Sequence, residues 1–160
     1  MYKRVLIVVD ARPVSAVATA EGLALANAHG AEVYFFTVMP SFPLLMADTP
    51  VYAVSAEQDF NQAAESNAKR LLDAASAAAT LEGVRCEVGQ GSGDDAARLI
   101  SQAADAQACD LIVVASEGRN ALIRMLTGSV IPGLITVSHL PVLICKDKTA
   151  HLAAEAPGNE

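Results

Sequence analysis

Five short apolar runs alternate along the chain with longer, alanine-rich segments, and this alternation constrains the fold more than any other feature of the sequence. The runs contain Val, Ile and Leu without alternating polar residues, which is typical of strands that are covered on both faces. They span Val5–Val9, Val33–Val38, Val84–Val88, Leu111–Ala115 and Val142–Cys145. Strands that alternate with helical segments predict a parallel sheet with right-handed crossovers, an α/β sandwich with helices on both faces.

Four segments between and after these runs have the spacing of amphipathic helices. Helices are expected over about residues 15–28, from a Ser55-x-x-Gln58 capping box to just before Gly83, after Gly93-Asp94, and from Ser129 to near His139. Ser15 is the expected cap of the first helix, and Gly30 is its expected stop.

Length and composition predict one domain. Of the 160 residues, 52% are apolar and 18% are charged, which suffices for one core but not for two. We expect this domain to span residues 1–147, and residues 148–160 to form a flexible C-terminal tail without periodicity. Residues 39–55 contain three prolines and several large apolar side chains. This segment either offers a surface to a partner, folds over a pocket, or packs on its own domain.

Charge and composition argue against several classes of function. The net charge of −7 repels a nucleic-acid backbone, and 4% aromatic residues without Trp leave few platforms for stacked bases. The chain has no run that approaches the roughly 18 apolar residues of a membrane helix. The three cysteines form no C-x-x-C pair and have no metal-ligand spacing. We therefore expect a cytoplasmic protein with reduced cysteines, no metal-ligating residues of its own, and no binding to nucleic acid or membrane.

Two separate segments look like parts of one binding site. Asp10 closes the first strand, and a glycine-punctuated loop, residues 115–130, follows the fourth. Ligands of open parallel sheets bind beyond the carboxyl ends of the strands, where the strand order reverses. Of the two common orders, 3-2-1-4-5 and 2-1-3-4-5, only the first places the ends of strands 1 and 4 side by side. Arg12, Arg119 and Arg124 lie in the same two segments and predict a locally basic site.

The loop after strand 4 has the chemistry of a phosphate site. Gly128-Ser129 opens a helix, so that backbone N–H groups and the positive end of the helix dipole would face an anion. Each feature also has a plain structural interpretation, because glycines form ordinary turns and an aspartate such as Asp10 closes turns or caps helices. Arg119 and Arg124 would then be solvated loop cations.

This loop resembles the nucleotide motif of the universal stress protein family, in which G-x-x-G is followed by nine residues and then G-S or G-T. Gly118, Gly128 and Ser129 fit that spacing. The resemblance continues at the end of the first strand and in three further segments, residues 29–33, 109–114 and 140–144. It therefore spans residues 3–146.

The resemblance implies an α/β sandwich of strand order 3-2-1-4-5, similar to the adenine nucleotide alpha hydrolases. It implies a regulatory protein of the stress response that binds ATP or AMP, with or without Mg²⁺. It also implies a homodimer through the edge strand Val142–Cys145. The family has a branch that binds ATP and a branch that does not, so a nucleotide-free dimeric interaction module of the same fold is the alternative.

The resemblance also implies a set of binding residues. The position of the family's adenosine-binding aspartate is Asp10, with Ala11 beside it, and the end of strand 2 would lend the backbone of Val38 to the adenine. The remaining positions would cover the nucleotide or hold its phosphates, and they are Ala115, Gly118, Arg119, Gly128, Ser129 and Val130.

This chain departs from the family pattern at two positions. Ala115 replaces the first glycine of the motif, and Ala11 follows the aspartate where a glycine is common. If the backbone at Ala115 needs a positive φ, the methyl group costs on the order of 1 kcal/mol, and if φ is negative the change is nearly free.

Dedicated catalysis is not expected from these residues. Phosphoryl transfer needs metal-holding acids and a positioned base, and near the expected site only Asp10 and Glu117 are acidic. No lysine follows the glycines as in a P-loop, so that slow ATP hydrolysis is the most we expect and no catalytic residue is assigned. A phosphorylated receiver domain is disfavoured, because the third strand is expected to end at Gly89-Gln90-Gly91 without an aspartate.

Overall fold

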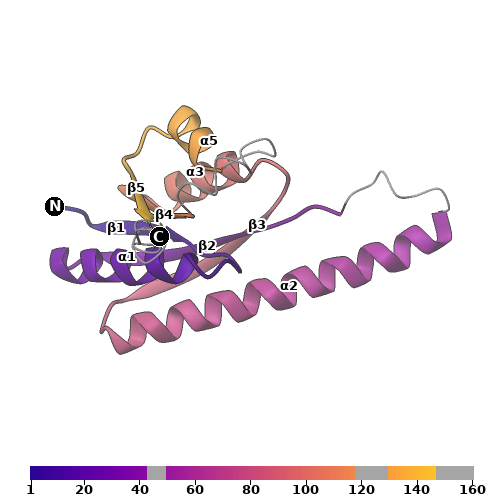
Figure 1. Cartoon of the computed structure of the whole chain (residues 1–160), viewed down its shortest axis with the longest axis horizontal. Coiled ribbons are helices and arrows are strands. Elements are labelled where there is room, and N and C mark those ends of the chain that lie inside the picture. The colour runs from indigo at the N-terminus through magenta and orange to yellow at the C-terminus, as the bar shows by residue number, and fades with distance from the viewer. Residues whose placement is uncertain (43–49, 118–129, 147–160) are drawn as a thin grey trace, which may run out of the picture.

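The computed structural model describes residues 1–42, 50–117 and 130–146, with only the backbone described for residues 50–54 (Figure 1). Five parallel strands form one sheet in the order β3-β2-β1-β4-β5. The strands are β1 Arg4–Val8, β2 Glu32–Met39, β3 Cys86–Ser92, β4 Leu111–Ser116 and β5 Val142–Lys146. The helices are α1 Ser15–His29, α2 Pro50–Leu81, α3 Ala96–Ala106 and α5 Val130–Val137. The order 3-2-1-4-5 is confirmed over 2-1-3-4-5.

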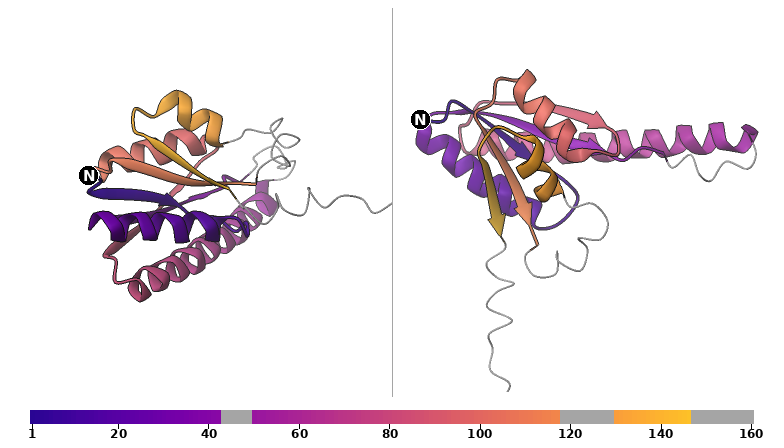
Figure 2. Two further views of the ribbon diagram at one scale, coloured as in Figure 1. Left: turned by 60° about the vertical axis from the view of Figure 1, so that its left-hand side comes forward. Right: turned by 90° about the horizontal axis from the view of Figure 1, so that it is seen from above.

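The helices form two layers around the sheet, with α1 and α2 on one face and α3 and α5 on the other (Figure 2). Side chains alternate between the faces along each strand. On β1, Val5 and Ile7 face the α1–α2 layer, whereas Leu6 faces the α3–α5 layer. All three are fully buried, which explains why the central strands read as continuous apolar runs.

The start of helix α1 differs from the sequence prediction, whereas its end agrees with it. Ser15 does not cap the helix but is its first residue, and its hydroxyl accepts a hydrogen bond from the Asp10 N–H at 3.0 Å. The expectation was wrong because the hydroxyl is used by the preceding turn. Gly30 ends the helix in the left-handed conformation, with φ of 63°, as expected.

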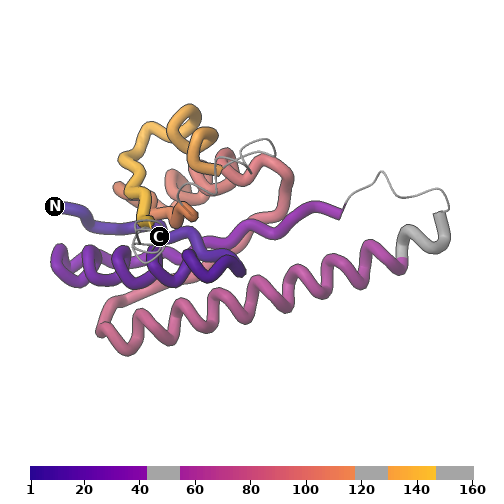
Figure 3. Tube along the Cα trace, in the orientation of Figure 1, coloured from indigo at the N-terminus to yellow at the C-terminus, as the bar shows by residue number. Residues whose placement is uncertain are grey.

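Helix α2 begins earlier than the capping box Ser55-x-x-Gln58 predicted. Its first residue is Pro50, so Ser55 lies within the helix. Proline suits the first helical position, because it has no N–H to leave unpaired and its φ is already helical. The chain trace in Figure 3 shows that the first half of α2 projects past the body of the domain. The ring of Phe42 meets that of Phe60 edge to face, at 5.5 Å between centroids.

Strand β3 continues past its expected end. Gly89 and Gly91 lie inside the strand, which ends at Ser92, and the prediction of a strand end at these glycines was wrong. Aromatic rings from the neighbouring strand β2 leave no room for side chains at these two positions. A Cβ on Gly89 would lie 1.8 Å from the Tyr34 hydroxyl oxygen, and one on Gly91 would lie 3.0 Å from the ring of Phe36. The glycines therefore give space to two aromatic rings that cover this edge of the sheet.

Helices α3 and α5 follow the sequence prediction closely. The Asp95 carboxylate caps α3 by accepting a hydrogen bond from the Arg98 N–H at 3.0 Å. Helix α5 packs against α3 at Gly133, where an added Cβ would lie 2.6 Å from that of Ala97. The expected tail, residues 148–160, lies outside the described residues.

Candidate functional site

The carboxyl ends of β1 and β4 meet at one edge of the sheet, as the sequence predicted. The two strands pair in parallel, with Ile7 opposite Val113, so the segments that follow them emerge side by side. Asp10 follows β1 and Glu117 follows β4. This edge is the point at which the chain order of the strands reverses, the usual ligand position in open α/β sheets.

Asp10 is held in place by the turn that leads into α1. Its backbone N–H donates to the hydroxyl of Ser15, and its carboxylate accepts from the backbone N–H of Arg12 at 2.8 Å. A carboxylate that accepts from the N–H two residues later forms an Asx turn. The position of this carboxylate is therefore determined by local hydrogen bonds rather than by distant packing.

The side chain of Arg12 folds back onto the same carboxylate. Its Nε lies 3.1 Å from each carboxylate oxygen of Asp10, and its Nη2 lies 2.6 Å from Oδ2. Hydrogen bonding to Asp10 raises the pKa of Arg12, and the charges of Asp10 and Glu117 act in the same direction. Arg12 thus lies within electrostatic reach of acids that follow two neighbouring strands.

This pairing bears on the expected charge of the site. We expected Arg12, Arg119 and Arg124 to make the site basic, but in the described part of the site the charge of Arg12 is neutralised by Asp10, and Glu117 adds a second acid. Arg119 and Arg124 lie outside the described residues.

Asp10 and Arg12 also line a cavity of about 520 Å³ between α1 and α2. The volume is in the range of small-molecule sites. Small and apolar side chains make up most of its walls, from α1 Ala16, Ala20, Leu23 and Ala24, and from α2 Leu71, Ala74, Ala75, Ala78 and Leu81. Sequence reasoning did not find this cavity, although Ala16, Ala20 and Ala24 recur at four-residue spacing on an exposed face of α1.

The structure answers the backbone question at Ala115. This residue lies within β4, opposite Cys145 of β5, and is 5% exposed. Among the described residues other than glycine, only Ala108 has a positive φ. Ala115 and Ala11 therefore adopt backbone conformations open to any residue, and alanine in place of glycine introduces no backbone strain at either position.

The remaining expected site residues fall into two groups. Val38 and Val130 are half-buried and pack against the core of the α3–α5 layer, on the opposite side of the sheet from the cavity. Gly118, Arg119, Gly128 and Ser129 lie outside the described residues. Among the expected site residues, Asp10 lies where β1 ends, beside the end of β4.

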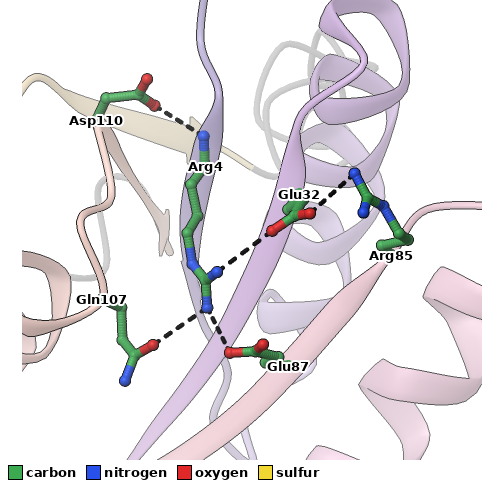
Figure 4. A network of polar contacts seen from close by, with 6 residues as sticks. All are labelled: Arg4, Glu32, Arg85, Glu87, Gln107 and Asp110. Carbon is green, nitrogen blue, oxygen red and sulfur yellow. Dashed lines mark hydrogen bonds and ion pairs between the residues drawn. The ribbon is translucent and has the colours of Figure 1, made fainter.

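A second group of paired charges, centred on Arg4, lies at the opposite, amino-terminal edge of the sheet, where the strands begin (Figure 4). The Arg4 guanidinium bonds the side chains of Glu32, Glu87 and Gln107, and its backbone N–H donates to Asp110. Burial acts to lower the pKa of Arg4, but the hydrogen bond and charge of Glu87 more than offset it, so the pKa lies above its ordinary value.

Two other kinds of site are absent from the described residues. In residues 1–42, 50–117 and 130–146, no group of three or more His, Cys, Asp or Glu side chains is placed to hold a metal ion. Within the same ranges, none of the helices combines the length and the apolar character that a membrane crossing requires.

Solved structures of other proteins share this fold. A universal stress protein family protein from Arabidopsis thaliana, with AMP bound, matches with a TM-score of 0.68 and 20% identity over 98% of this chain and 97% of its own. A universal stress protein from Archaeoglobus fulgidus in complex with dAMP has a TM-score of 0.62 and 21% identity, over 91% and 98%. A universal stress protein in complex with cAMP has a TM-score of 0.66 and 24% identity, over 89% and 96%.

The sequence match agrees with the shared fold. The model of the universal stress protein family matches residues 1–146, which includes every described strand and helix. Because this match covers most of the chain, the protein belongs to the universal stress protein family.

Proposed function

We propose that this protein binds an adenine nucleotide, ATP or AMP with or without Mg²⁺, at the carboxyl ends of β1 and β4 and acts as a regulatory protein of the stress response. The observation that carries the proposal is the meeting of Asp10 with the end of β4 at the reversal of strand order. Structures of relatives with AMP, dAMP and cAMP support the class of ligand.

In this proposal, Asp10 and Ala11 approach the adenosine and the backbone of Val38 contacts the adenine. The positions expected to cover the nucleotide and hold its phosphates are Ala115, Gly118, Arg119, Gly128, Ser129 and Val130. The unstrained backbone of Ala115 supports this assignment, because it removes one reason to place the chain in the non-binding branch.

Thermal unfolding with and without nucleotide tests the proposal. A ligand that binds only the folded state stabilises it by about 2.7 kcal/mol at 100 times its Kd, which corresponds to a rise in Tm of about 5–10 °C for a chain of this length. Ser129→Ala should reduce the rise. Ser76→Ala is the matched control, because it removes the same hydroxyl group away from the proposed site, near Cys86 at the start of β3. The rise in Tm should be unchanged in this variant. No rise for the wild type at millimolar AMP or ATP would favour the nucleotide-free interaction module.

We also propose a homodimer through the edge strand β5. Val142, Leu143 and Ile144 are only half-buried, and an edge strand with exposed backbone groups readily pairs with a second copy. Sedimentation velocity of Ile144→Lys should show a loss of dimer. Val88→Lys introduces the same charge on β3, the other edge strand, at a side chain that is 47% exposed, and it should leave the dimer intact. A monomeric wild type would overturn the proposal.

A further inference from the structure

Arg12 donates hydrogen bonds to both carboxylate oxygens of Asp10. An ionised carboxylate offers about four lone-pair positions. Arg12 makes four contacts to it: the backbone N–H reaches Oδ1 at 2.8 Å, Nε reaches both oxygens at 3.1 Å, and Nη2 reaches Oδ2 at 2.6 Å. A ligand hydroxyl or amino group that is to donate to Asp10 must therefore displace the Arg12 side chain.

The Arg12 side chain is also free to leave. It is 45% exposed and the Asp10 side chain is 32% exposed, and ion pairs in such positions contribute little to folding. The backbone contact from Arg12 N to Asp10 Oδ1 keeps the turn in shape without the guanidinium. Displacement therefore opens the carboxylate while the binding edge keeps its conformation.

A displaced guanidinium needs a new anion. Asp10 contacts the Arg12 guanidinium directly and Glu117 acts on it only through its charge, so a ligand that takes over Asp10 leaves the Arg12 charge with less compensation. A phosphate supplies this compensation, because a guanidinium binds phosphate through paired N–H groups as it binds a carboxylate. A nucleoside displaces the Arg12 side chain from Asp10 but provides no negative charge to pair with it.

We propose that Arg12 is a specificity-determining residue that makes the site select phosphate-bearing adenine ligands over the nucleoside, by closing Asp10 in the free protein and turning to the ligand phosphate on binding. This inference rests on the proposed function, since it concerns the ligand of that same site. It assigns to Arg12 two successive partners, Asp10 first and the phosphate second.

Calorimetric titration of AMP and adenosine into the wild type, Arg12→Ala and Arg12→Lys tests the inference. Arg12→Ala should bind adenosine about fivefold more tightly and AMP no more tightly than the wild type, so that the ratio of the adenosine Kd to the AMP Kd falls by a factor of about five or more. Arg12→Lys, which keeps the charge without the paired N–H groups, should have an intermediate ratio. Arg98→Ala removes a similar pair, 3.3 Å from Asp95 at the start of α3, and should leave the ratio unchanged.

The outcomes separate the inference from the proposed function. AMP binding by the wild type with an unchanged ratio in Arg12→Ala would overturn the role of Arg12 and leave the proposed function standing. Absence of AMP binding to the wild type at millimolar concentration would overturn both. The Nε–H NMR resonance of Arg12 gives a second readout: AMP should shift it, and an unshifted resonance at saturating AMP would contradict the inference even where adenosine binding is too weak to titrate.

Discussion

The two edges of the sheet each have an arginine paired with acids, but the pairs differ in where the partners come from. At the amino-terminal edge, Arg4 is 19% exposed and joins Glu32 of β2, Glu87 of β3 and Gln107 at the end of α3 (Figure 4). At the carboxyl edge, Arg12 bonds a carboxylate only two residues away in the sequence.

This difference determines which of the two arginines is available to bind a ligand. The partners of Arg4 lie on separate elements, so its pairs join β1 to β2, β3 and the end of α3. The Arg12 pair lies within one turn that its backbone hydrogen bonds already maintain. Breaking that pair costs the fold little, which leaves its groups available for binding.

Replacement of Arg4 should produce the largest effect on stability. Arg4→Ala removes the cation that joins Glu32 to Glu87, although Glu32 keeps its pair with Arg85, and we expect the free energy of unfolding to fall by about 2 kcal/mol. Arg12→Ala is the matched variant at the other edge and should cost less than about 1 kcal/mol. Urea unfolding measures both. Equal losses for the two variants would remove the distinction between the edges.

Alkaline pH should weaken the amino-terminal edge through Cys109. Burial raises the pKa of the Cys109 thiol to about 11, while the nearby Arg4 acts to lower it. The unfolded chain releases this proton at lower pH, so stability is complete below about pH 9 and falls as the pH rises toward 11. Burial also raises the pKa of Tyr34, which acts in the same direction.

The expected contribution of Cys109 is on the order of 1–2 kcal/mol. Urea unfolding of the wild type at pH 7.5, 9 and 10.5 should show the decline, and Cys109→Ala should show a smaller one. A decline of the same size in both proteins would mean that other groups are responsible.

Neutralisation of one acid at each edge should have the smallest effect and should separate stability from binding. Glu87→Gln weakens the pair with Arg4, and we expect a loss of about 0.5–1 kcal/mol with no change in AMP affinity. Glu117→Gln should leave stability within about 0.5 kcal/mol and tighten AMP binding about twofold, because it removes a negative charge beside Arg12. A change in AMP affinity from Glu87→Gln, together with a loss of stability from Glu117→Gln, would contradict this difference between the two edges.

The strand order was predictable because the segments after strands 1 and 4 both have the residues of a binding site, and one site requires the two strands to be neighbours. Asp10 and the glycine loop read as parts of one site, and only the order 3-2-1-4-5 joins the ends of their strands. The start of α2 was missed because the capping box at Ser55 is a local pattern, whereas Pro50 satisfies the helix terminus earlier. Gly89 read as a strand end because the Tyr34 ring that requires it comes from another strand.

Within the site, the sequence indicated where Asp10 lies but not that Arg12 pairs with it. The place of Asp10 follows from the end of its strand. The neutralisation of Arg12 depends on the turn that aims its side chain at Asp10, and no spacing pattern in the sequence indicates that contact. The cavity between α1 and α2 depends on how far apart these helices lie over the sheet, which their separate periodicities do not determine.

An NMR titration of the isotope-labelled protein with AMP tests the proposed nucleotide site most directly, because it follows the backbone amide resonances of both edges of the sheet at once. AMP should shift the resonances of Asp10, Arg12 and Ser116, at the carboxyl ends of β1 and β4, and leave those of Arg4 and Asp110 in place. Shifts confined to Arg4 and Asp110, or no shifts at saturating AMP, would contradict it.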